Sequence, residues 1–172
     1  MLTAGLAVLS LIALLWMWLL VSPAHRATFR DLLDAHTPLP EPPQLPAVSM
    51  IVPARNEAAM LPSTVPTFCT QDYPDLRVVV VNDQSEDESQ ALLEDLSRRF
   101  ANLRVIVAAD KPAGWCGKCW AVQEGYRIAD ADWLLFTDAD CHMHPRAVRQ
   151  AIAYMQASGL DMLSLFPFVR FG

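Results

Sequence analysis

Short, fully apolar runs alternate with helix-forming segments from Val48 onward, and this alternation constrains the fold more than any other feature of the chain. Such runs, rich in Val, Ile and Leu, are typical of strands that are buried on both faces of a sheet. The predicted strands span residues 48–52, 76–81, 103–108, 133–136 and 162–166, and the predicted helices span residues 59–68, 87–99, 117–128 and 146–156. This order predicts an α/β fold, in which a mostly parallel sheet is flanked by helices on both faces. Ser85, with Glu88 three residues later, resembles a capping box and predicts the start of the second helix.

Polar side chains follow three of the predicted strands, at Asn56, at Asp83 and at the pair Asp138 and Asp140. Ligands of parallel sheets bind at the carboxyl ends of the strands, so these side chains are expected to face one crevice. Two carboxylates at the end of a buried strand suit Mg²⁺ or Mn²⁺, which take oxygen ligands and keep positions open for substrate phosphates. An isolated pair of this kind is otherwise read as two solvated turn residues.

The first 24 residues are predicted to be a transmembrane anchor. Residues 2–21 carry no charge, and roughly 20 residues at 1.5 Å each span the ~30 Å of bilayer hydrocarbon. A cleaved signal peptide is the alternative, but no Lys or Arg precedes the apolar run. Arg26 and Arg30 follow it, so the positive-inside rule predicts a single-pass protein of the cell inner membrane with its folded part in the cytoplasm.

A juxtamembrane helix and a proline-rich linker are expected over residues 25–47. The linker sequence T-P-L-P-E-P-P-Q-L-P-A cannot sustain a helix or a central strand and is typical of a stiff spacer. The remaining residues, 48–172, are enough for one domain. The formal net charge of −6 argues against a nucleic-acid partner, because such binding needs clustered Lys and Arg.

Four segments, taken in order, resemble the nucleotide-sugar half of family 2 glycosyltransferases. They read V-S-M-I-V-P-A-R-N-E, V-V-V-V-N-D-Q-S-E-D-E-S, G-K-C-W-A-V-Q-E-G and L-L-F-T-D-A-D, and the resemblance covers residues 48–146. The form G-W-x-G-K-x-W-A at residues 114–121 is most similar to the hopene-associated glycosyltransferases of bacteria. The resemblance implies a fold of the GT-A type with a Rossmann-like nucleotide-sugar half.

The resemblance also implies how the diphosphate of a nucleotide sugar is held. Asp140 and Asp138 would bind the metal, with Asp140 as the more direct ligand and Asp138 also next to the donor. Lys118 stands at a predicted helix start, where free N–H groups and an ammonium group both favour phosphate. The alternative for Lys118 is an ordinary solvated lysine on a helix.

For the nucleoside, the resemblance implies that Asp83 accepts a hydrogen bond from the N3–H group of uracil. Pro53, Ala54 and Arg55 would line the nucleoside pocket, largely through backbone atoms, with the acidic Glu57 beside them. Asp83 can instead simply begin a turn, since Asn-Asp is common in turns. Arg55 can be a surface side chain, because many members of the family carry an aromatic residue at this place.

The activity that the resemblance implies is metal-dependent, inverting transfer of a sugar from a nucleoside diphosphate sugar, expected to be UDP-linked. The acceptor is expected to be a lipid or another membrane-associated alcohol. In the family the general base lies after the metal pair, but Asp161 is the single acidic residue in 146–172 and opens a predicted strand. We therefore expect the base to lie beyond Gly172 and the chain to be a fragment without the acceptor half. A donor-binding module without turnover is an alternative.

The cysteines suggest two further alternatives. W-C-G-K-C also resembles the thioredoxin active site, which makes a membrane-tethered thiol-disulfide oxidoreductase using Cys116 and Cys119 the runner-up. An extra loop before the motif and two strand-helix units that a redox domain does not need count against it. Together with Cys141, His142 and His144, this pair would supply enough ligands for zinc, but the spacing matches no common zinc module.

Overall fold

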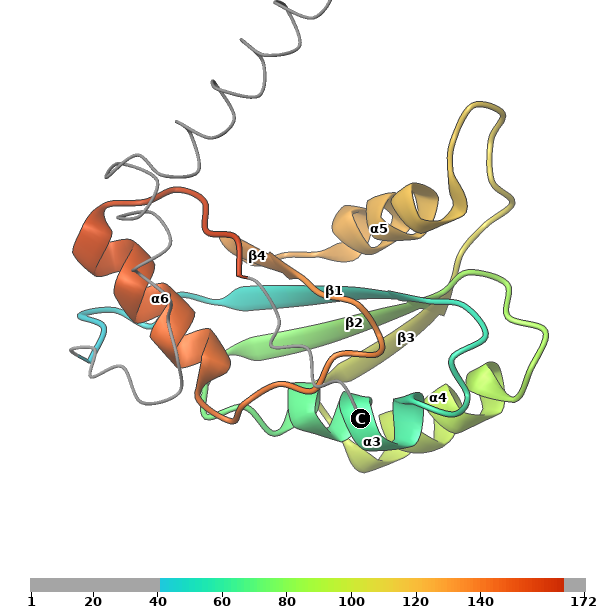
Figure 1. Ribbon diagram of the computed structural model, residues 1–172, viewed down its shortest axis with the longest axis horizontal. Coiled ribbons are helices and arrows are strands. Elements are labelled where there is room, and N and C mark those ends of the chain that lie inside the picture. The colour runs from blue at the N-terminus through green and yellow to red at the C-terminus, as the bar shows by residue number, and fades with distance from the viewer. Residues whose placement is uncertain (1–40, 166–172) are drawn as a thin grey trace, which may run out of the picture. The chain divides into compact units, whose positions relative to one another are not determined.

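The structure is a computed structural model that describes residues 41–165 (Figure 1). Its elements in chain order are β1 (Val48–Ala54), α3 (Leu61–Cys69), β2 (Leu76–Asn82), α4 (Ser89–Arg99), β3 (Leu103–Val107), α5 (Gly117–Ile128), β4 (Trp133–Phe136) and α6 (Ala147–Ser158). The predicted anchor lies outside the described residues. Among residues 41–165, no helix has the length and apolar character that a membrane span requires.

The sheet of the described residues has the strand order β3-β2-β1-β4, and all of its pairings are parallel. β1 is central, because Val48 is in register with Leu76 of β2 on one side and with Trp133 of β4 on the other. α5 covers one face of this sheet, whereas α3 and α4 cover the other face (Figure 1). The predicted α/β class, with helices on both faces of a parallel sheet, is confirmed.

Side-chain alternation along the strands supplies two separate cores, and this explains why the strands are apolar throughout. On the α3 and α4 face, buried residues of the sheet, α3, α4 and α6 pack together, among them Met50, Val52, Leu61, Val65, Phe68, Val78, Val80, Leu93, Val148 and Ile152. On the α5 face a smaller core contains Val79, Val81, Ala108, Trp120 and Ala121. Because both faces exclude water, a polar residue at almost any position of β1 or β2 would be buried.

α5 approaches the sheet closely at Gly125. A Cβ atom at this position would lie 2.6 Å from Cγ2 of Ile51, a distance that real Cβ atoms essentially never show, and 3.0 Å from Cγ2 of Val81, which is unusually tight. Only glycine therefore fits between α5 and the two central strands. The close packing fixes the height of α5 above the sheet and thereby the position of its first turn.

Two expectations from the sequence are wrong. Residues 162–165 form no strand, and Met162 and Leu165 are exposed. An apolar run becomes a strand only where a sheet edge pairs with it, and in the described residues β4 pairs with β1 alone. Ser85 and Glu88 do not form a capping box, because α4 begins at Ser89 and Glu88 is its N-cap without a side-chain bond. The Ser85 hydroxyl instead accepts a hydrogen bond from the Asn56 N–H group.

Candidate functional site

The site is built where the carboxyl ends of β1, β2 and β4 meet the first turn of α5. Asp83 follows β2 directly and is buried, with 8% of its surface exposed. A Cβ atom at Gly117, the first residue of α5, would lie 2.5 Å from Oδ2 of Asp83. The absence of a side chain at Gly117 therefore lets the first turn of α5 lie directly against this carboxylate. The free N–H groups of a helix start favour negative charge, so the start of α5 is a favourable neighbour for the Asp83 carboxylate.

Arg55 follows β1 and reaches toward the same carboxylate. Its Nη1 atom lies 3.8 Å from Oδ2 of Asp83, and 55% of the arginine side chain is exposed against 11% of the aspartate side chain. The ion pair joins the ends of β1 and β2. Because the Arg55 side chain is exposed, it can leave the buried Asp83 carboxylate and pair with another anion. Arg55 is thus a surface side chain, as the alternative from the sequence had it, and it also pairs with Asp83.

The backbone beside Arg55 is tied to Asp83 as well. The Ala54 carbonyl accepts a hydrogen bond from the Asp83 N–H group at 2.8 Å. Pro53 is half-buried and Ala54 is buried, both at the end of β1. Glu57 starts α3 through its backbone, because its carbonyl accepts from the Leu61 N–H group at 3.0 Å. The residues predicted to line a nucleoside pocket thus lie at one strand end, next to Asp83.

Lys118, the second residue of α5, connects this region to the loop after β4. Its Nζ atom lies 2.6 Å from Oδ1 of Asp138. The pKa of Lys118 is raised, first by the hydrogen bond to Asp138 and then by the negative charges of Asp138 and Asp140. The ammonium group therefore lies where the fields of both carboxylates converge. Lys118 is thus both largely exposed, as the alternative of a solvated helical lysine expects, and paired with Asp138.

The first turn of α5 brings together the ends of β2 and β4, as the sequence predicted. Gly117 lies against Asp83, and the next residue, Lys118, lies against Asp138. Asp140 acts electrostatically on the same ammonium group. The site is thus one group of neighbouring residues, which contains a buried carboxylate, a helix start, a lysine and an acidic pair.

The acidic pair is compatible with a hard divalent cation. Asp138 and Asp140 offer carboxylate oxygens, which Mg²⁺ and Mn²⁺ prefer, and the charges of both raise the pKa of the nearby Lys118 ammonium. Within residues 41–165, no group of three or more His, Cys, Asp or Glu side chains is arranged to hold a metal ion. The zinc alternative, which used Cys116, Cys119 and three further residues, is therefore wrong.

Hydrogen bonds that the sequence analysis missed join the loops after β1 and β2. The Asn56 N–H group donates to Oγ of Ser85 at 2.9 Å, and Oδ1 of Asn56 accepts from the Glu86 N–H group at 2.8 Å. Oδ2 of Asp87 accepts from the Ala58 N–H group at 3.1 Å. Asn56 also has a positive φ of 54°, which turns the chain sharply after β1. The run S-E-D-E-S after β2 was the available signal, since such side chains bond to nearby backbone groups.

Asp87 lies at the contact between these two loops, which we call the loop junction. Its Oδ1 atom accepts from the Ser89 N–H group at 3.0 Å, and Oγ of Ser89 accepts from the Glu57 N–H group at 3.0 Å. The pKa of Asp87 is lowered, first by the hydrogen bond from the Ser89 hydroxyl and also by bonds from the backbone N–H groups of Ala58 and Ser89. The junction fixes the loop that carries Glu57 against the start of α4.

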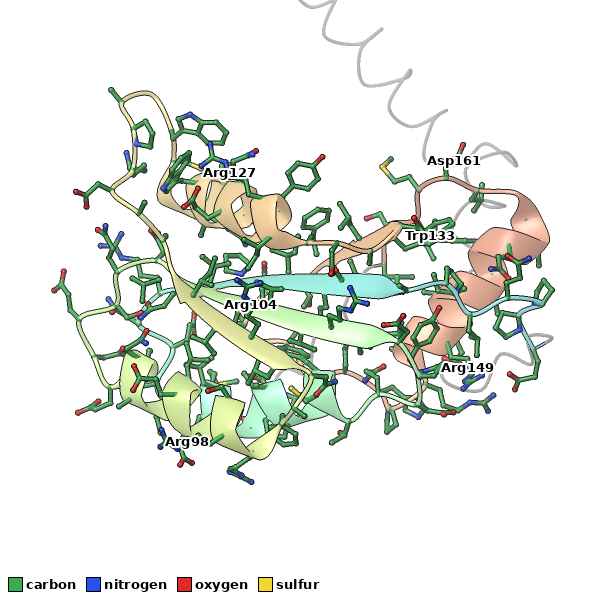
Figure 2. The ribbon with its side chains drawn as sticks, turned by 180° about the vertical axis from the view of Figure 1, so that it is seen from behind. Arg98, Arg104, Arg127, Trp133, Arg149 and Asp161 are labelled. Atoms are coloured by element: carbon green, nitrogen blue, oxygen red, sulfur yellow. The ribbon has the colours of Figure 1, made fainter. Side chains whose placement is uncertain are left out.

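Asp161 lies away from this set of residues. Figure 2 shows it at the same end of the molecule as Trp133, the first residue of β4, whereas the site lies at the opposite end of the strands. Asp161 therefore does not complete the acidic cluster of the described residues.

A parallel α/β unit with these residues at its strand ends defines a nucleotide-binding class of fold, and the sequence comparison names the family. Residues 49–172 match the family model "Glycosyl transferase family 2", and the chain belongs to this family. Because the family is shown over most of the chain, the thioredoxin-like reading of Cys116 and Cys119 as the basis of the fold is wrong. The predicted family 2 resemblance is confirmed.

Individual relatives extend this result. The chain is 30% identical over 122 residues to a beta-monoglucosyldiacylglycerol synthase of Synechocystis sp., covering 70% of this chain and 25% of the relative. The mannosyltransferase PcManGT of Pyrobaculum calidifontis, solved with GDP-Man and Mn²⁺, has a TM-score of 0.59 and 25% identity over 70% of this chain and 36% of its own. S. aureus TarS 1-349, solved with UDP-GlcNAc, has a TM-score of 0.55 and 26% identity over 64% of this chain and 31% of its own. The chain spans a quarter to a third of the length of these three proteins.

Proposed function

We propose that this chain is the donor-binding half of a glycosyltransferase that moves a sugar from a nucleoside diphosphate sugar to a lipid or another membrane-associated acceptor. One observation carries the proposal: the first turn of α5 holds Gly117 against the buried Asp83 and Lys118 against Asp138. A diphosphate is a doubly charged leaving group, and a helix start with an adjacent lysine is suited to it. The lipid acceptor is supported by the name of the Synechocystis relative.

In this proposal Asp83 holds the base. Its buried carboxylate accepts hydrogen bonds only, so it selects a base with an N–H group on its binding edge, as uracil has. In the structure its partner is Arg55, and a bound nucleoside would displace the arginine toward the phosphates. Pro53, Ala54 and Glu57 form the neighbouring wall. The choice of uridine is supported by the TarS complex with UDP-GlcNAc.

Lys118 and the start of α5 bind the diphosphate, and Asp138 and Asp140 hold Mg²⁺ or Mn²⁺. When bound, the metal supplies positive charge that neutralises the leaving diphosphate. Lys118 transfers from Asp138 to a phosphate oxygen, so the acidic pair becomes free for the metal as the donor arrives. The proposal of a metal is supported by the Mn²⁺ in the PcManGT structure.

The remaining parts of the proposal concern the whole protein. Transfer is proposed to be inverting, and the general base is proposed to lie beyond Gly172, as the family resemblance implied. The protein is proposed to sit at the cell inner membrane through residues 1–24, with residues 48–172 in the cytoplasm. The similarity of residues 114–121 to hopene-associated glycosyltransferases makes a polycyclic lipid the first acceptor to test.

The proposal is tested by titrating the 172-residue chain in detergent with UDP, with and without Mn²⁺, by calorimetry. We expect Mn²⁺ to strengthen UDP binding at least tenfold, and Asp140→Asn to abolish this gain. Asp161→Asn is the matched control, because this carboxylate lies at the other end of the strands. Equal UDP affinity in the presence and absence of Mn²⁺, or an unchanged Asp140→Asn variant, would contradict the metal assignment. Absence of UDP binding under all conditions would contradict the proposed function.

A further inference from the structure

Cys116 and Cys119 flank the two residues of α5 that contact the acidic side chains of the site. Cys116 is the N-cap of α5 and has an extended backbone, with φ −83° and ψ 153°. This conformation turns its side chain back over the first turn, where Sγ accepts a hydrogen bond from the Cys119 N–H group at 3.3 Å. Both thiols are free and exposed.

The two thiols differ in acidity. The pKa of Cys116 is lowered, first by the hydrogen bond from the Cys119 thiol and then by that from the Cys119 N–H group. The pKa of Cys119 is raised, first by the same thiol contact and then by the charge of Cys116. Burial raises the pKa of Cys69 to about 12, so that thiol stays protonated. Because the thiolate is the reactive form, Cys116 is suited to be the attacking sulfur and Cys119 the second one.

We propose that Cys116 and Cys119 form a reversible dithiol–disulfide pair, whose oxidation by a small disulfide reshapes the first turn of α5. The Cys116 thiolate attacks one sulfur of the small disulfide, forms a mixed disulfide and releases one thiolate. Cys119, after losing its proton to water, attacks Cys116 of the mixed disulfide and releases the second thiolate. The two cysteines lose two electrons and two protons in total, and the small disulfide becomes two thiols. Both thiols are free and exposed, and solvent access is one of the properties that make a cysteine sensitive to oxidation.

Disulfide formation acts directly on the turn that holds Gly117 and Lys118. The Cys116 sulfur now accepts from the Cys119 N–H group, and it has to turn to the Cys119 sulfur to form the S–S bond. Gly117 and Lys118 lie inside the ring that this bond closes, so we expect them to adjust to it. Gly117 has no free space on its Asp83 side, and Lys118 is held by Asp138. We expect the oxidised turn to lose this arrangement and to bind a diphosphate more weakly, an effect that rests on the proposed function.

The dithiol itself is tested without any nucleotide. The full chain in detergent is incubated with oxidised glutathione, and the products are followed by mass spectrometry and peptide mapping. We expect a mass loss of two hydrogen atoms and a single disulfide between residues 116 and 119. Cys119→Ser should stop at one glutathione adduct on Cys116, Cys116→Ser should react more slowly, and Cys141→Ser should behave as the unmodified chain. A disulfide that includes Cys141 or Cys69, equal rates for both single variants, or two thiols that stay free would overturn the proposal.

The change in the turn has a readout that does not depend on the donor. Trp115 precedes Cys116, and its ring lies edge-on to Trp120 of α5 with a centroid distance of 5.4 Å. Oxidation should change tryptophan fluorescence, and dithiothreitol should restore it. Trp115→Phe should lose most of the change, and Cys119→Ser should show none of this intramolecular response. Unchanged fluorescence in a chain whose disulfide has been mapped would overturn the structural half of the proposal.

UDP titration then separates this inference from the proposed function. Oxidised chain should bind UDP about tenfold more weakly than reduced chain, and reduction should restore the affinity. If the disulfide forms and UDP binds both forms equally, the coupling to the site is wrong. If neither form binds UDP, the proposed function is wrong, while mass and fluorescence still decide whether the pair is redox-active.

Discussion

The Lys118 ammonium lies 2.6 Å from Oδ1 of Asp138, so the residue proposed to bind phosphate is paired with a carboxylate proposed to bind metal. The two side chains come from different elements, the first turn of α5 and the loop after β4. Both are largely exposed, and exposed ion pairs stabilise a protein by only about 0–1 kcal/mol. The pair can therefore open at little cost when a diphosphate and a cation arrive together.

Removing the charge of Lys118 is expected to have opposite effects on the two ligands. Lys118→Met should weaken UDP binding about tenfold, which corresponds to roughly 1.4 kcal/mol. The same change frees Asp138, so Mn²⁺ should bind more tightly in the absence of nucleotide. Electron paramagnetic resonance of free Mn²⁺ measures the second effect, and Lys111→Met is the control. Unchanged or weaker Mn²⁺ binding by Lys118→Met would show that Asp138 is not a ligand.

Two glycine-to-alanine changes in α5 should separate site geometry from core packing. Gly117→Ala places a methyl group where Oδ2 of Asp83 now lies, and this mobile carboxylate can turn away. We expect a folded protein with UDP affinity at least tenfold lower. Gly125→Ala meets the buried side chains of Ile51 and Val81, so it should destabilise the fold by about 1–3 kcal/mol. Urea unfolding and UDP titration of both variants measure the two effects, and equal UDP affinity in Gly117→Ala and the unmodified chain would contradict the assignment of Asp83.

Replacing the buried carboxylate should change base selectivity. Asp83→Asn keeps the shape of the side chain but adds N–H donors that repel the N3–H group of uracil. We expect weaker UDP binding and a smaller preference for UDP over CDP, because cytosine has an acceptor nitrogen where uracil has its N3–H group; both are measured by competition titration. Asp75→Asn, an exposed residue that precedes β2, is the control. An unchanged preference in Asp83→Asn would place the base elsewhere.

The loop junction around Asp87 predicts a defined pH dependence. The folded pKa of this carboxyl is lowered from its usual 3.8 by hydrogen bonds from Ser89 and from the Ala58 N–H group. The ionised form therefore stabilises the fold above pH 3.8, and this contribution is lost as the pH falls through the lower folded pKa. Asp87→Asn should reduce the urea midpoint at pH 7, and the difference from the unmodified chain should shrink below pH 3.8. Asp95→Asn, an exposed residue of α4 paired with Arg98, is the matched control and should show a smaller effect at pH 7. An equal effect in both variants would mean that the junction adds no stability of its own.

The principal elements and much of the site were predictable because they depend on local pattern. Continuous apolar runs followed by helix-forming segments indicated four strands of a parallel sheet, and parallel strands place their carboxyl ends at one edge. Asn56, Asp83 and the pair Asp138 and Asp140 were therefore expected to face one crevice. Lys118 and Asp138 were assigned as separate ligands of the donor and metal, and their direct pairing was not foreseen.

Contacts between distant segments were not predictable in the same way. Ser85 and Glu88 have the spacing of a capping box, but the Asn56 N–H group, 29 residues away from Ser85, binds the serine hydroxyl instead. Residues 162–165 have the composition of a buried strand, yet no described strand pairs with them. In both cases the outcome depends on whether a partner segment lies close by in the folded chain, and the local sequence does not determine this.

The sequence alone determined the order of strands and helices, because in any chain strands and helices each space their buried apolar residues in a characteristic way that is set by backbone geometry. It also determined which residue types follow the strands. The tertiary structure decided the strand order β3-β2-β1-β4 and the close approach of Gly117 to Asp83. The strand order depends on which strands pair, and the approach of Gly117 depends on how closely α5 packs on β1 and β2; both are set by contacts between residues far apart in the chain.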